Sequence, residues 1–308
     1  MSFIGLLKPT GPSGFGHNAT AMHVTADLDL SDKSYLITGC NSGLGLETLR
    51  VLTSRGARVI ATARTLEKAK LACRAAGARK RELTTALACE LSDPNSIRVV
   101  VDSVKSLGLR LDGIIANAGI MALPRLVQNH GIESQFFTNH VGHFLLVTSL
   151  LSQLTCTGRV VMVSSSAHRG TYQGGLRLDD LSGELKGYTP WGAYGQSKLA
   201  NLLFAKSLAK RLPQPGQRAN SVHPGVIMTN LGRHSPLFSA LRLVQPLFLK
   251  TIPQGAATQC FATAHPHVNQ FNGEFLVDCN LAKPSAHGRD AQLAEDLWDA
   301  TEKIVARL

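Results

Sequence analysis

Short apolar runs alternate with helical patterns along most of this chain, and the alternation limits the folds open to it. We expect strands at 34–38, 58–62, 83–89, 111–116, 159–163, 218–222 and 274–277. We expect helices near 43–55, 66–76, 94–107, 131–155, 192–211 and 254–264, and a last one at 290–306. Strands that are apolar along nearly their whole length, with helices between them, indicate a parallel sheet covered on both faces. The sequence therefore predicts a doubly wound α/β fold with a sheet of about seven strands.

The elements follow one another without an internal repeat or an interior linker. Residues 1–30 are rich in Gly, Pro and His, so we expect an N-terminal arm there. One domain is then expected over residues 31–308. The chain is 44% hydrophobic and 17% charged, which is the balance of a globular protein with enough apolar material for a core.

Charge and cysteine usage narrow the function classes further. The net charge is +11, but the basic residues are scattered, so we expect a solvated basic surface and no nucleic-acid partner. The six cysteines form no Cys-x-x-Cys pair and no metal-finger spacing, which favours small buried thiols in a reducing compartment. No apolar stretch reaches the roughly 18 residues of a membrane span, and we see no signal peptide. These features predict a cytoplasmic protein.

The first strand runs into a glycine-rich turn that is followed directly by a helix. Gly39 permits the tight turn, Gly43 lets the backbone approach a phosphate, and Gly45 lets helix and strand pack closely. The helix N-terminus offers free N–H groups and a partial positive charge to a pyrophosphate. A plain βα turn is the alternative, but a strand before and a helix after are the context of a Rossmann-type dinucleotide site. Its first contacts are expected at Gly39, Asn41, Ser42, Gly43, Leu44 and Gly45.

The end of the second strand bears on which dinucleotide is bound. Rossmann domains that bind NAD usually carry an Asp or Glu there for the ribose 2′-hydroxyl. This chain has no acid at that place and carries Arg64 instead. A guanidinium suits a 2′-phosphate through bidentate, charge-assisted hydrogen bonds. NADP(H) is therefore favoured and NAD(H) is possible, with an ordinary surface arginine as the alternative.

Other cofactor contacts are expected at the carboxyl ends of the later strands, because open α/β sheets bind ligands at that edge. After the third and fourth strands these are Glu90, Leu91, Asn117, Ala118 and Gly119. After the sixth strand, where Pro-Gly turns the chain, they are Pro224, Gly225, Val226 and Thr229.

Tyr194 and Lys198 lie four residues apart in a predicted helix, which puts them on one face, one turn from each other. A cation so close favours the phenolate, so we expect the pKa of Tyr194 to fall from about 10 toward the working pH. A tyrosine tuned in this way is a useful proton donor and acceptor. The alternative is an ordinary amphipathic helix with an exposed tyrosine and lysine. The catalytic interpretation of Tyr194 and Lys198 is favoured if other segments of the chain can bind a hydride-carrying cofactor and a carbonyl group.

Two further patterns suggest other chemistries. His140 and His143 could hold a metal, but no third ligand with matching spacing is found, so packed or hydrogen-bonded histidines are favoured and we expect no metal site. The fifth strand is followed by Ser164, Ser165, Ser166 and then His168, and serines so close to a histidine suggest a hydrolase as the runner-up enzyme class. The Gly-x-Ser-x-Gly elbow of such enzymes is missing from this segment. Asn139, beside His140, is the more informative polar residue of the long helix.

Six motifs follow one another along the chain. They are Thr38-Gly39-x-x-x-Gly43-x-Gly45, Asn117-Ala118-Gly119, Asn139, Ser165, Tyr194-x-x-x-Lys198 and Pro224-Gly225. Over roughly residues 33–280 they resemble the short-chain dehydrogenase/reductase family. Finer motifs resemble its retinol-dehydrogenase-like branch, which includes a chloroplast-envelope relative: Thr-Asn-His-x-Gly-His-Phe at 138–144, Tyr-Gly-Gln-Ser-Lys-Leu-Ala-Asn at 194–201, His-Pro-Gly-x-x-Met-Thr-Asn-Leu at 223–231 and Pro-Gln-Gly-Ala-Ala-Thr at 253–258.

The resemblance implies an NADP-dependent oxidoreductase that interconverts a carbonyl and its alcohol. It implies that Tyr194 is the general acid of reduction and the base of oxidation, and that Lys198 lowers the tyrosine pKa and holds the nicotinamide ribose. It further implies that Ser165 hydrogen-bonds the carbonyl oxygen and that Asn139 keeps a water in a proton relay. Two departures from the family pattern are expected: Glu90 occupies a position where an Asp is usual beside the adenine, and we expect no counterpart of the branch's membrane anchor.

The substrate is suggested only by the segment after the Pro-Gly turn. Apolar residues recur there at helical spacing, namely Leu237, Leu241, Val244 and Phe248. We expect a substrate lid at about 227–252, and its apolar face suggests that the substrate is a lipophilic aldehyde, ketone or alcohol. An equally favoured alternative is that these apolar residues only pack on the domain. Arg233, Arg242 and Lys250 would allow a peripheral membrane contact. We expect a homo-oligomer, and the alternative function is a dinucleotide-binding scaffold or redox sensor with little turnover.

Overall fold

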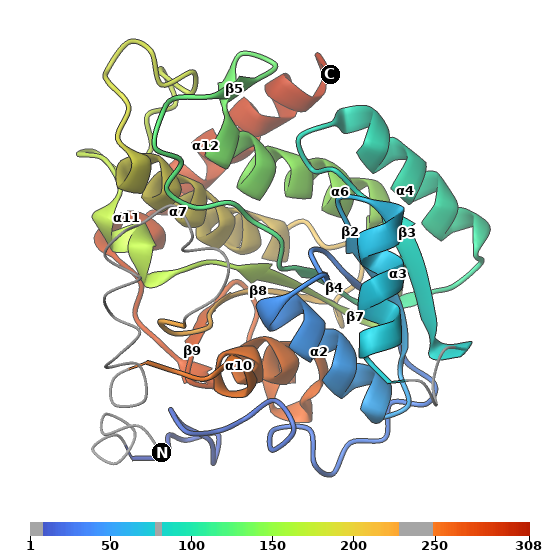
Figure 1. Ribbon diagram of the computed structural model, residues 1–308. Coiled ribbons are helices and arrows are strands. Elements are labelled where there is room, and N and C mark those ends of the chain that lie inside the picture. Colours follow the sequence, from blue (N-terminus) through green and yellow to red (C-terminus); the bar gives the residue numbers. More distant parts are fainter. Residues whose placement is uncertain (1–8, 78–81, 228–248) are drawn as a thin grey trace.

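The computed structural model describes residues 9–77, 82–227 and 249–308, and its centre is a twisted sheet (Figure 1). The sheet has eight strands in the order β10-β9-β8-β7-β4-β1-β2-β3, and every neighbouring pair is parallel except β9 and β10. The strands are β1 (Ser34–Ile37), β2 (Arg58–Ala63), β3 (Thr84–Ala88), β4 (Leu111–Ala116), β7 (Leu154–Val163), β8 (Arg218–His223), β9 (Phe275–Val277) and β10 (Asn280–Leu281). The predicted doubly wound α/β fold is confirmed.

The eighth strand is the one that the sequence did not indicate. β10 has two residues and returns antiparallel to β9 through a tight turn at Asp278 and Cys279, both of which have positive φ. A strand this short carries no periodicity, so an apolar alternation cannot reveal it.

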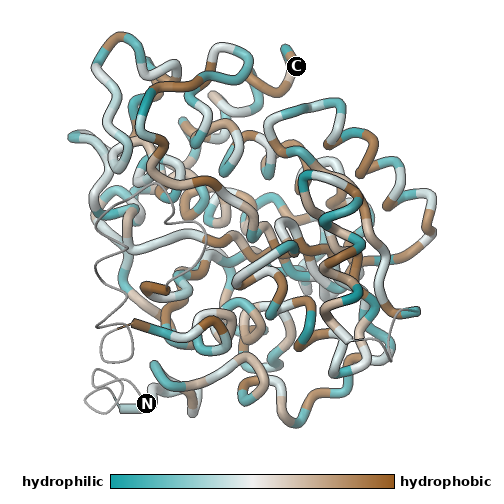
Figure 2. The backbone as a smooth tube through the Cα atoms, viewed as in Figure 1, coloured by the Kyte–Doolittle hydropathy of each residue, from teal (hydrophilic) through white to brown (hydrophobic). Residues whose placement is uncertain are grey.

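Helices cover both faces of the sheet. On one face lie α2 (Gly43–Ser54), α3 (Leu66–Ala75) and α10 (Ile252–Ala264), and on the other lie α4 (Pro94–Ser106), α6 (Gly142–Leu150), α7 (Pro190–Ala209) and α12 (Ala291–Val305). Successive strand residues point to opposite faces, as in β1, where Leu36 packs with one helix layer while Tyr35 and Ile37 pack with the other. Figure 2 shows brown, hydrophobic residues in the central strands and an alternation of brown and teal residues along the surrounding helices.

The helix starts are encoded by capping residues. The side chains of Thr65, Asp93 and Thr189 each accept a hydrogen bond from a backbone N–H in the first turn of α3, α4 and α7, respectively. At α10, Thr251 and Gln254 form a reciprocal capping box. These signals explain why the predicted helices begin within two residues of the observed ones at these four places.

The prediction of one long helix over 131–155 is wrong in its details. The hairpin β5 (Gln128–Asn129) and β6 (Ile132–Glu133) precedes it, and the helix begins only at α5 (Ser134–Phe136). It continues through a π-helical turn, η2 (Phe137–Val141), into α6 and ends in the 3-10 turn η3 (Leu151–Gln153), after which β7 starts earlier than predicted. Gly131 in the hairpin has φ +74°, a conformation that ends an α-helix.

The described part of the N-terminal arm packs on α10. Ala19, Ala21 and Val24 are buried in the same cluster as Phe261, and the Ala21 N–H donates a hydrogen bond to the Pro253 carbonyl. The arm therefore covers the outer side of the helix that follows the predicted lid. Residues 228–248 of the predicted lid lie outside the described residues, and they include Leu237, Leu241, Val244, Phe248, Arg233 and Arg242.

Candidate active site

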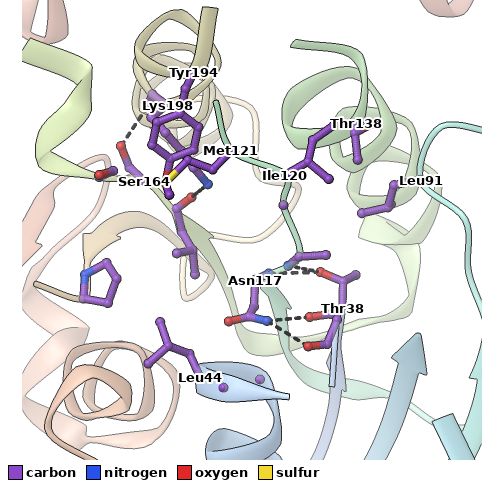
Figure 3. Close-up of a pocket in the computed structure, with 18 of the residues that line it drawn as sticks. Thr38, Leu44, Leu91, Asn117, Ile120, Met121, Thr138, Ser164, Tyr194 and Lys198 are labelled. Carbon is purple, nitrogen blue, oxygen red and sulfur yellow. Dashed lines mark hydrogen bonds between the residues drawn. The ribbon is translucent and has the colours of Figure 1, made fainter. Parts of the chain in front are cut away.

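A cavity of about 880 Å³ opens at the carboxyl ends of the central strands. It is lined by the ends of β1, β2, β3, β4, β7 and β8 together with the start of α2 and the first half of α7 (Figure 3). All but one of the site residues proposed from the sequence either line it or contact a residue that does: Gly39, Asn41, Ser42, Gly43, Leu44, Gly45, Arg64, Glu90, Leu91, Asn117, Ala118, Gly119, Ser165, Tyr194, Lys198, Pro224, Gly225 and Val226 line it, and Asn139 bonds to Ile120 of the lining. Thr229 lies outside the described residues.

The glycine turn at the end of β1 is shaped by close backbone approaches. Gly39 has φ +72°, and a Cβ there would lie 2.9 Å from Ala118. A Cβ on Gly45 would lie 2.2 Å from the Gly39 carbonyl oxygen, so helix α2 can approach β1 only with glycine at that position. Ser42, the N-cap of α2, makes no side-chain capping bond, and the first turn holds no acidic residue. The N-terminus of α2 therefore faces the cavity with N–H groups suited to an anion.

Thr38 ties this turn to the segment after β4. Its Oγ1 accepts hydrogen bonds from the backbone N–H groups of Asn117 and Ala118, each at 3.0 Å. The Asn117 side-chain amide donates in return to the Thr38 and Gly39 carbonyls at 2.8 and 3.3 Å (Figure 3). The two strand ends that flank the cavity are thus fixed to each other by polar bonds.

The ends of β2 and β3 carry the groups that would meet the adenosine half of a dinucleotide. Arg64 is exposed and lines the cavity, and no ion pair with a described residue occupies its guanidinium. Glu90 is held differently, because its Oε1 accepts bonds from the Ser92 N–H and hydroxyl at 3.1 and 2.9 Å. The glutamate at the place where the family usually has an aspartate is thus engaged in a local turn, while Leu91 is buried against Gly142.

The three serines after β7 have different partners. The Ser164 hydroxyl is buried and donates to the Lys198 carbonyl at 2.7 Å, so it supports helix α7. Ser166 begins the short 3-10 turn η4 (Ser166–Gly170), with its N–H directed to His223 Nδ1 at 3.3 Å. The Ser165 side chain is the one that hydrogen-bonds to Tyr194. Of the three, Ser165 is therefore placed beside the proposed acid.

Tyr194 and Lys198 both point from α7 into the cavity region (Figure 3). The Lys198 Nζ atom donates to the Val163 carbonyl at 2.9 Å and lies 5.7 Å from the centroid of the Tyr194 ring. Burial lowers the pKa of Lys198 to about 8. Burial also raises the pKa of Tyr194 to about 12, against a smaller lowering by the hydrogen bond to Ser165. The expected fall of the tyrosine pKa is therefore wrong for this structure, because desolvation disfavours the charged form of both groups.

Asn139 sits in the π-helical turn η2, where its side chain is fully buried. Its amide forms a reciprocal pair with the Ile120 backbone, at 2.8 Å to the N–H and 2.9 Å to the carbonyl, and also donates to the Ser197 hydroxyl at 2.9 Å. The side chain thus joins the strand end after β4 to helix α7. Asn139 lies within a π-turn, an irregularity that is frequent at functional sites.

The two histidines considered as metal ligands have other partners. His143 Nδ1 is 2.9 Å from the Asn139 carbonyl, and its Nε2 is 2.8 Å from Thr38 Oγ1. His140 Nε2 is 2.9 Å from the Thr301 hydroxyl of α12. Within the described ranges no group of three His, Cys, Asp or Glu side chains is placed to hold a metal ion. Both rings are buried, and burial lowers the pKa of His143 to about 4 and that of His140 to about 3.

The pairing suggested for a hydrolase does not form. His168 directs Nδ1 to the Ser165 carbonyl oxygen at 2.6 Å, while its Nε2 accepts from the Ser285 N–H at 3.1 Å. Neither ring nitrogen approaches the Ser165 hydroxyl, which accepts from the Ala167 N–H at 3.2 Å. The geometry gives His168 no role as the base of a serine nucleophile.

Several functional positions were missing from the sequence prediction. Thr38 and Ser197 hold Asn117 and Asn139, and Met121, Leu123 and Trp191 add an apolar wall to the cavity. Trp191 meets Tyr194 edge to face at 6.0 Å between ring centroids. Trp191 precedes Tyr194 by three residues on a predicted helix, and this spacing could have indicated that the two rings lie on the same face. The contacts of Thr38 join residues far apart in the sequence, so no local sequence pattern predicts them.

Comparison with known proteins agrees with this architecture. A family model described as short chain dehydrogenase matches residues 33–176. The chain is 41% identical to the short-chain dehydrogenase TIC 32 A, chloroplastic, of Brassica napus, over 97% of this chain and 96% of that protein. It is 38% identical to retinol dehydrogenase 12 of Mus musculus, over 99% and 96% of the two chains. An uncharacterized protein from Mycobacterium paratuberculosis shares the fold with a TM-score of 0.75 and 33% identity, over 94% of this chain and 98% of that one.

In the described parts of the chain, no helix has the length and apolarity required to cross a membrane. All six cysteines are free thiols, and five of them are buried, as the sequence indicated.

Proposed function

The chain belongs to the short-chain dehydrogenase/reductase family, and from this premise we propose that it is an NADP-dependent oxidoreductase acting on a lipophilic carbonyl or alcohol. The observation that carries the proposal is the convergence of Ser165, Tyr194 and Lys198 on the cavity that also contains the glycine turn 39–45. A carbonyl-binding hydroxyl, a proton donor and a dinucleotide cradle in one cavity are the parts that hydride transfer to a carbonyl requires.

Each of these side chains has a distinct role in the proposal. The Ser165 hydroxyl donates a hydrogen bond to the substrate oxygen, and Tyr194 transfers its phenolic proton to that oxygen during reduction. The raised pKa of Tyr194 supports this direction, because a tyrosine that stays protonated is ready to act as the acid. Lys198 stabilises the phenolate that remains, and Asn139 holds the Ile120 segment in register with α7. When bound, NADP(H) supplies or accepts the hydride.

The cofactor assignment rests on the donor groups around the cavity. The uncapped N-terminus of α2 suits the pyrophosphate, and the exposed guanidinium of Arg64 suits a 2′-phosphate. The remaining proposed contacts are Gly39, Asn41, Ser42, Gly43, Leu44, Gly45, Glu90, Leu91, Asn117, Ala118, Gly119, Pro224, Gly225, Val226 and Thr229. NAD(H) remains the second candidate, since the same cradle would accept it without the Arg64 contact.

The substrate class follows from the wall opposite the glycine turn. Met121, Leu123, Val127 and Trp191 line this part of the cavity, and Val127 and Trp191 are half exposed at 50% and 44%. Large apolar side chains left partly open to solvent beside a proton donor favour an apolar substrate body. The name of the relative retinol dehydrogenase 12 supports the same class of ligand.

The proposal is tested by NADPH consumption across aliphatic, aromatic and retinoid carbonyls with the wild type and Tyr194→Phe. We expect reduction of at least one lipophilic carbonyl by the wild type and a loss of about 10²-fold or more in Tyr194→Phe, with NADPH affinity largely kept. Tight NADPH binding without turnover of any of these carbonyls would favour the dinucleotide-binding scaffold or redox sensor instead. Equal turnover by Tyr194→Phe would overturn the role given to Tyr194.

The remaining assignments are also proposals. We place the protein in a reducing compartment and favour the cytoplasm, which the six free thiols support, although the relatives named TIC 32 are chloroplastic. We further propose one catalytic domain over residues 31–308, no nucleic-acid partner and a homo-oligomeric state. Light scattering after size-exclusion chromatography measures the last of these, and fractionation of tagged protein measures the first.

A further inference from the structure

His168 is a buried histidine beside the site to which the proposed reaction gives no role. It lies in the 3-10 turn η4, three residues after Ser165, and its side chain is 0% exposed. The ring packs edge to face on Phe275 of β9 at 5.1 Å between centroids. Its two nitrogens meet main-chain groups from distant parts of the chain, the Ser165 carbonyl at 2.6 Å and the Ser285 N–H at 3.1 Å.

These two partners fix the protonation state of the ring. A carbonyl oxygen can only accept, so Nδ1 must carry the proton that it shares with Ser165. A backbone N–H can only donate, so Nε2 must be the unprotonated nitrogen that receives the bond from Ser285. In a charged imidazolium Nε2 would also carry a proton, so the Nε2–H and the Ser285 N–H would face each other without an acceptor between them. His168 is therefore neutral and in one tautomer, and burial, which lowers its pKa, acts in the same direction.

The bond to Ser285 anchors the turn after β7 to the C-terminal part of the chain. Ser285 is the N-cap of the short helix α11 (Ala286–Arg289), and its hydroxyl accepts from the Gly288 N–H at 3.1 Å. Next to His168, the Arg169 guanidinium donates to the Lys283 carbonyl at 2.6 Å. His168 and Arg169 thus both join the turn η4 to the loop 283–285. The His168 ring also bonds to the Ser165 carbonyl, so it connects Ser165 to this loop.

We propose that His168 is a positioning residue that holds the Ser165 backbone against the loop 283–285 and so directs the Ser165 hydroxyl toward Tyr194. The inference rests on the proposed function, in which Ser165 binds the substrate oxygen. Ser165 is the last extended residue before η4, with φ −157°, so its side-chain direction follows the orientation of its own peptide groups. A displacement of about 1 Å at such a group can cost about 10²-fold in rate while binding elsewhere in the site is kept.

The two hydrogen bonds of the ring can be separated by two substitutions. In His168→Asn, the amide nitrogen lies near the place of Nδ1 and can still donate to the Ser165 carbonyl. In His168→Gln, the amide oxygen reaches toward the place of Nε2 and can still accept from the Ser285 N–H. A purely structural histidine would respond to both changes alike, whereas a residue that positions Ser165 responds to the loss of the Nδ1 donor.

The experiment compares kcat, KM for NADPH and melting temperature of both variants with the wild type. We expect similar decreases in melting temperature, an unchanged KM for NADPH, and a kcat that is about tenfold or more lower in His168→Gln than in His168→Asn. The matched control is the pair His140→Asn and His140→Gln, because His140 is also buried but bonds to Thr301 away from the cavity. Equal kcat values for the two His168 variants, or the same asymmetry in the His140 pair, would overturn the inference.

A second readout does not depend on turnover. Nuclear magnetic resonance of isotope-labelled histidine nitrogens, assigned with the His168 variants, reports which ring nitrogen carries the proton. We expect His168 to be neutral and protonated on Nδ1 near neutral pH. A ring protonated on Nε2, or a charged ring, would overturn the inference whether or not the enzyme is active. Absence of carbonyl reduction in the wild type, in contrast, would contradict the proposed function and leave this measurement to decide on His168.

Discussion

The Nζ atom of Lys198 lies 5.7 Å from the centroid of the Tyr194 ring, one helical turn along α7, and both groups are buried. The pair is thus arranged as the four-residue spacing indicated, but burial changes the chemistry that the spacing alone suggests. It raises the pKa of Tyr194 to about 12 and lowers that of Lys198 to about 8. The lysine is consequently the group of the pair that titrates within the working range of an enzyme.

The first prediction is a loss of carbonyl reduction at high pH. Below a pKa of about 8, Lys198 is an ammonium that stabilises the phenolate left when Tyr194 gives up its proton, and above it the amine is neutral. The kcat/KM for reduction should therefore fall as pH rises through about 8. Lys198→Arg keeps its charge throughout this range, so its residual activity should show no such fall. A wild-type profile that stays level to pH 10 would contradict the assignment.

The second prediction concerns stability in acid. Burial lowers the pKa of His143 to about 4 and that of His140 to about 3, whereas both titrate near 6.5 in the unfolded chain. Between pH 6.5 and 4 the unfolded state binds more protons, so the free energy of unfolding should decrease as pH falls, by up to about 1.4 kcal/mol per pH unit for each histidine.

Urea unfolding at several pH values measures this slope. His140→Gln removes one of the two titrating groups and should make the slope shallower. His130 is exposed, so His130→Gln is the control that should keep the wild-type slope. An unfolding free energy that does not change from pH 6.5 to 4 would contradict the neutral, buried state of both rings.

The third prediction concerns cofactor choice. Arg64→Gln removes the cation at the end of β2 and should weaken NADPH binding by about 10- to 100-fold, since a hydrogen bond to a charged group contributes about 1.5–3 kcal/mol. NADH affinity should change little, because NADH lacks the 2′-phosphate. Fluorescence titration with both cofactors measures the difference, and Arg74→Gln, on the exposed last turn of α3, is the control. Equal losses for NADPH and NADH would show that Arg64 does not read the phosphate.

The fourth prediction concerns Thr38, whose hydroxyl receives the N–H groups of Asn117 and Ala118 and contacts His143. Thr38→Val keeps the shape but leaves these buried groups without their partner, so it should destabilise the fold by about 2–5 kcal/mol and weaken NADPH binding. Thr38→Ser keeps the hydroxyl and should cost about 1 kcal/mol or less. Chemical unfolding of the two variants gives the comparison, and equal losses would mean that the methyl group, not the hydroxyl, is the important part.

The contrast between Thr38 and its neighbour Gly39 shows how far the sequence could be interpreted. The family, the doubly wound fold and most element positions were predicted correctly, because apolar runs such as 111–116 and caps such as Thr65 are local signals. The glycine turn was also visible, since its conformation demands glycine. The partners of Thr38 come from residues 79 and 80 positions away, and only the folded chain brings them together.

Two errors have the same physical origin. The helix expected at 131–155 overlaps the β5–β6 hairpin, because strands of two residues and a π-turn produce no periodicity by which the sequence could distinguish them from an α-helix. The expected fall of the Tyr194 pKa followed from its distance along the helix to Lys198, but the sign of the shift depends on burial by surrounding elements. In both cases the local sequence pattern predicts which nearby residues share a helix, but it contains no information on the distant elements that surround them.

The last prediction concerns an ion pair beside the Pro224-Gly225 turn. The Lys250 side chain is 2% exposed and pairs with Asp278 in the β9–β10 turn. It also covers Gly225, where a Cβ would lie 2.7 Å from Lys250 Cδ, and the Lys250 N–H bonds to the Val226 carbonyl. Lys250 therefore connects the end of β8, which borders the cavity, to the edge of the sheet.

Removing one partner of a buried pair leaves the other charge uncompensated, which costs about 3–5 kcal/mol. Lys250→Met should approach that loss, and Asp278→Asn should lose less because Asp278 is 17% exposed and can be hydrated. The double variant should be more stable than Lys250→Met alone, since it leaves no buried charge. Urea unfolding of the three variants completes a double-mutant cycle. Strictly additive losses would mean that the two side chains are not coupled, and that Lys250 acts on the Gly225 turn through packing alone.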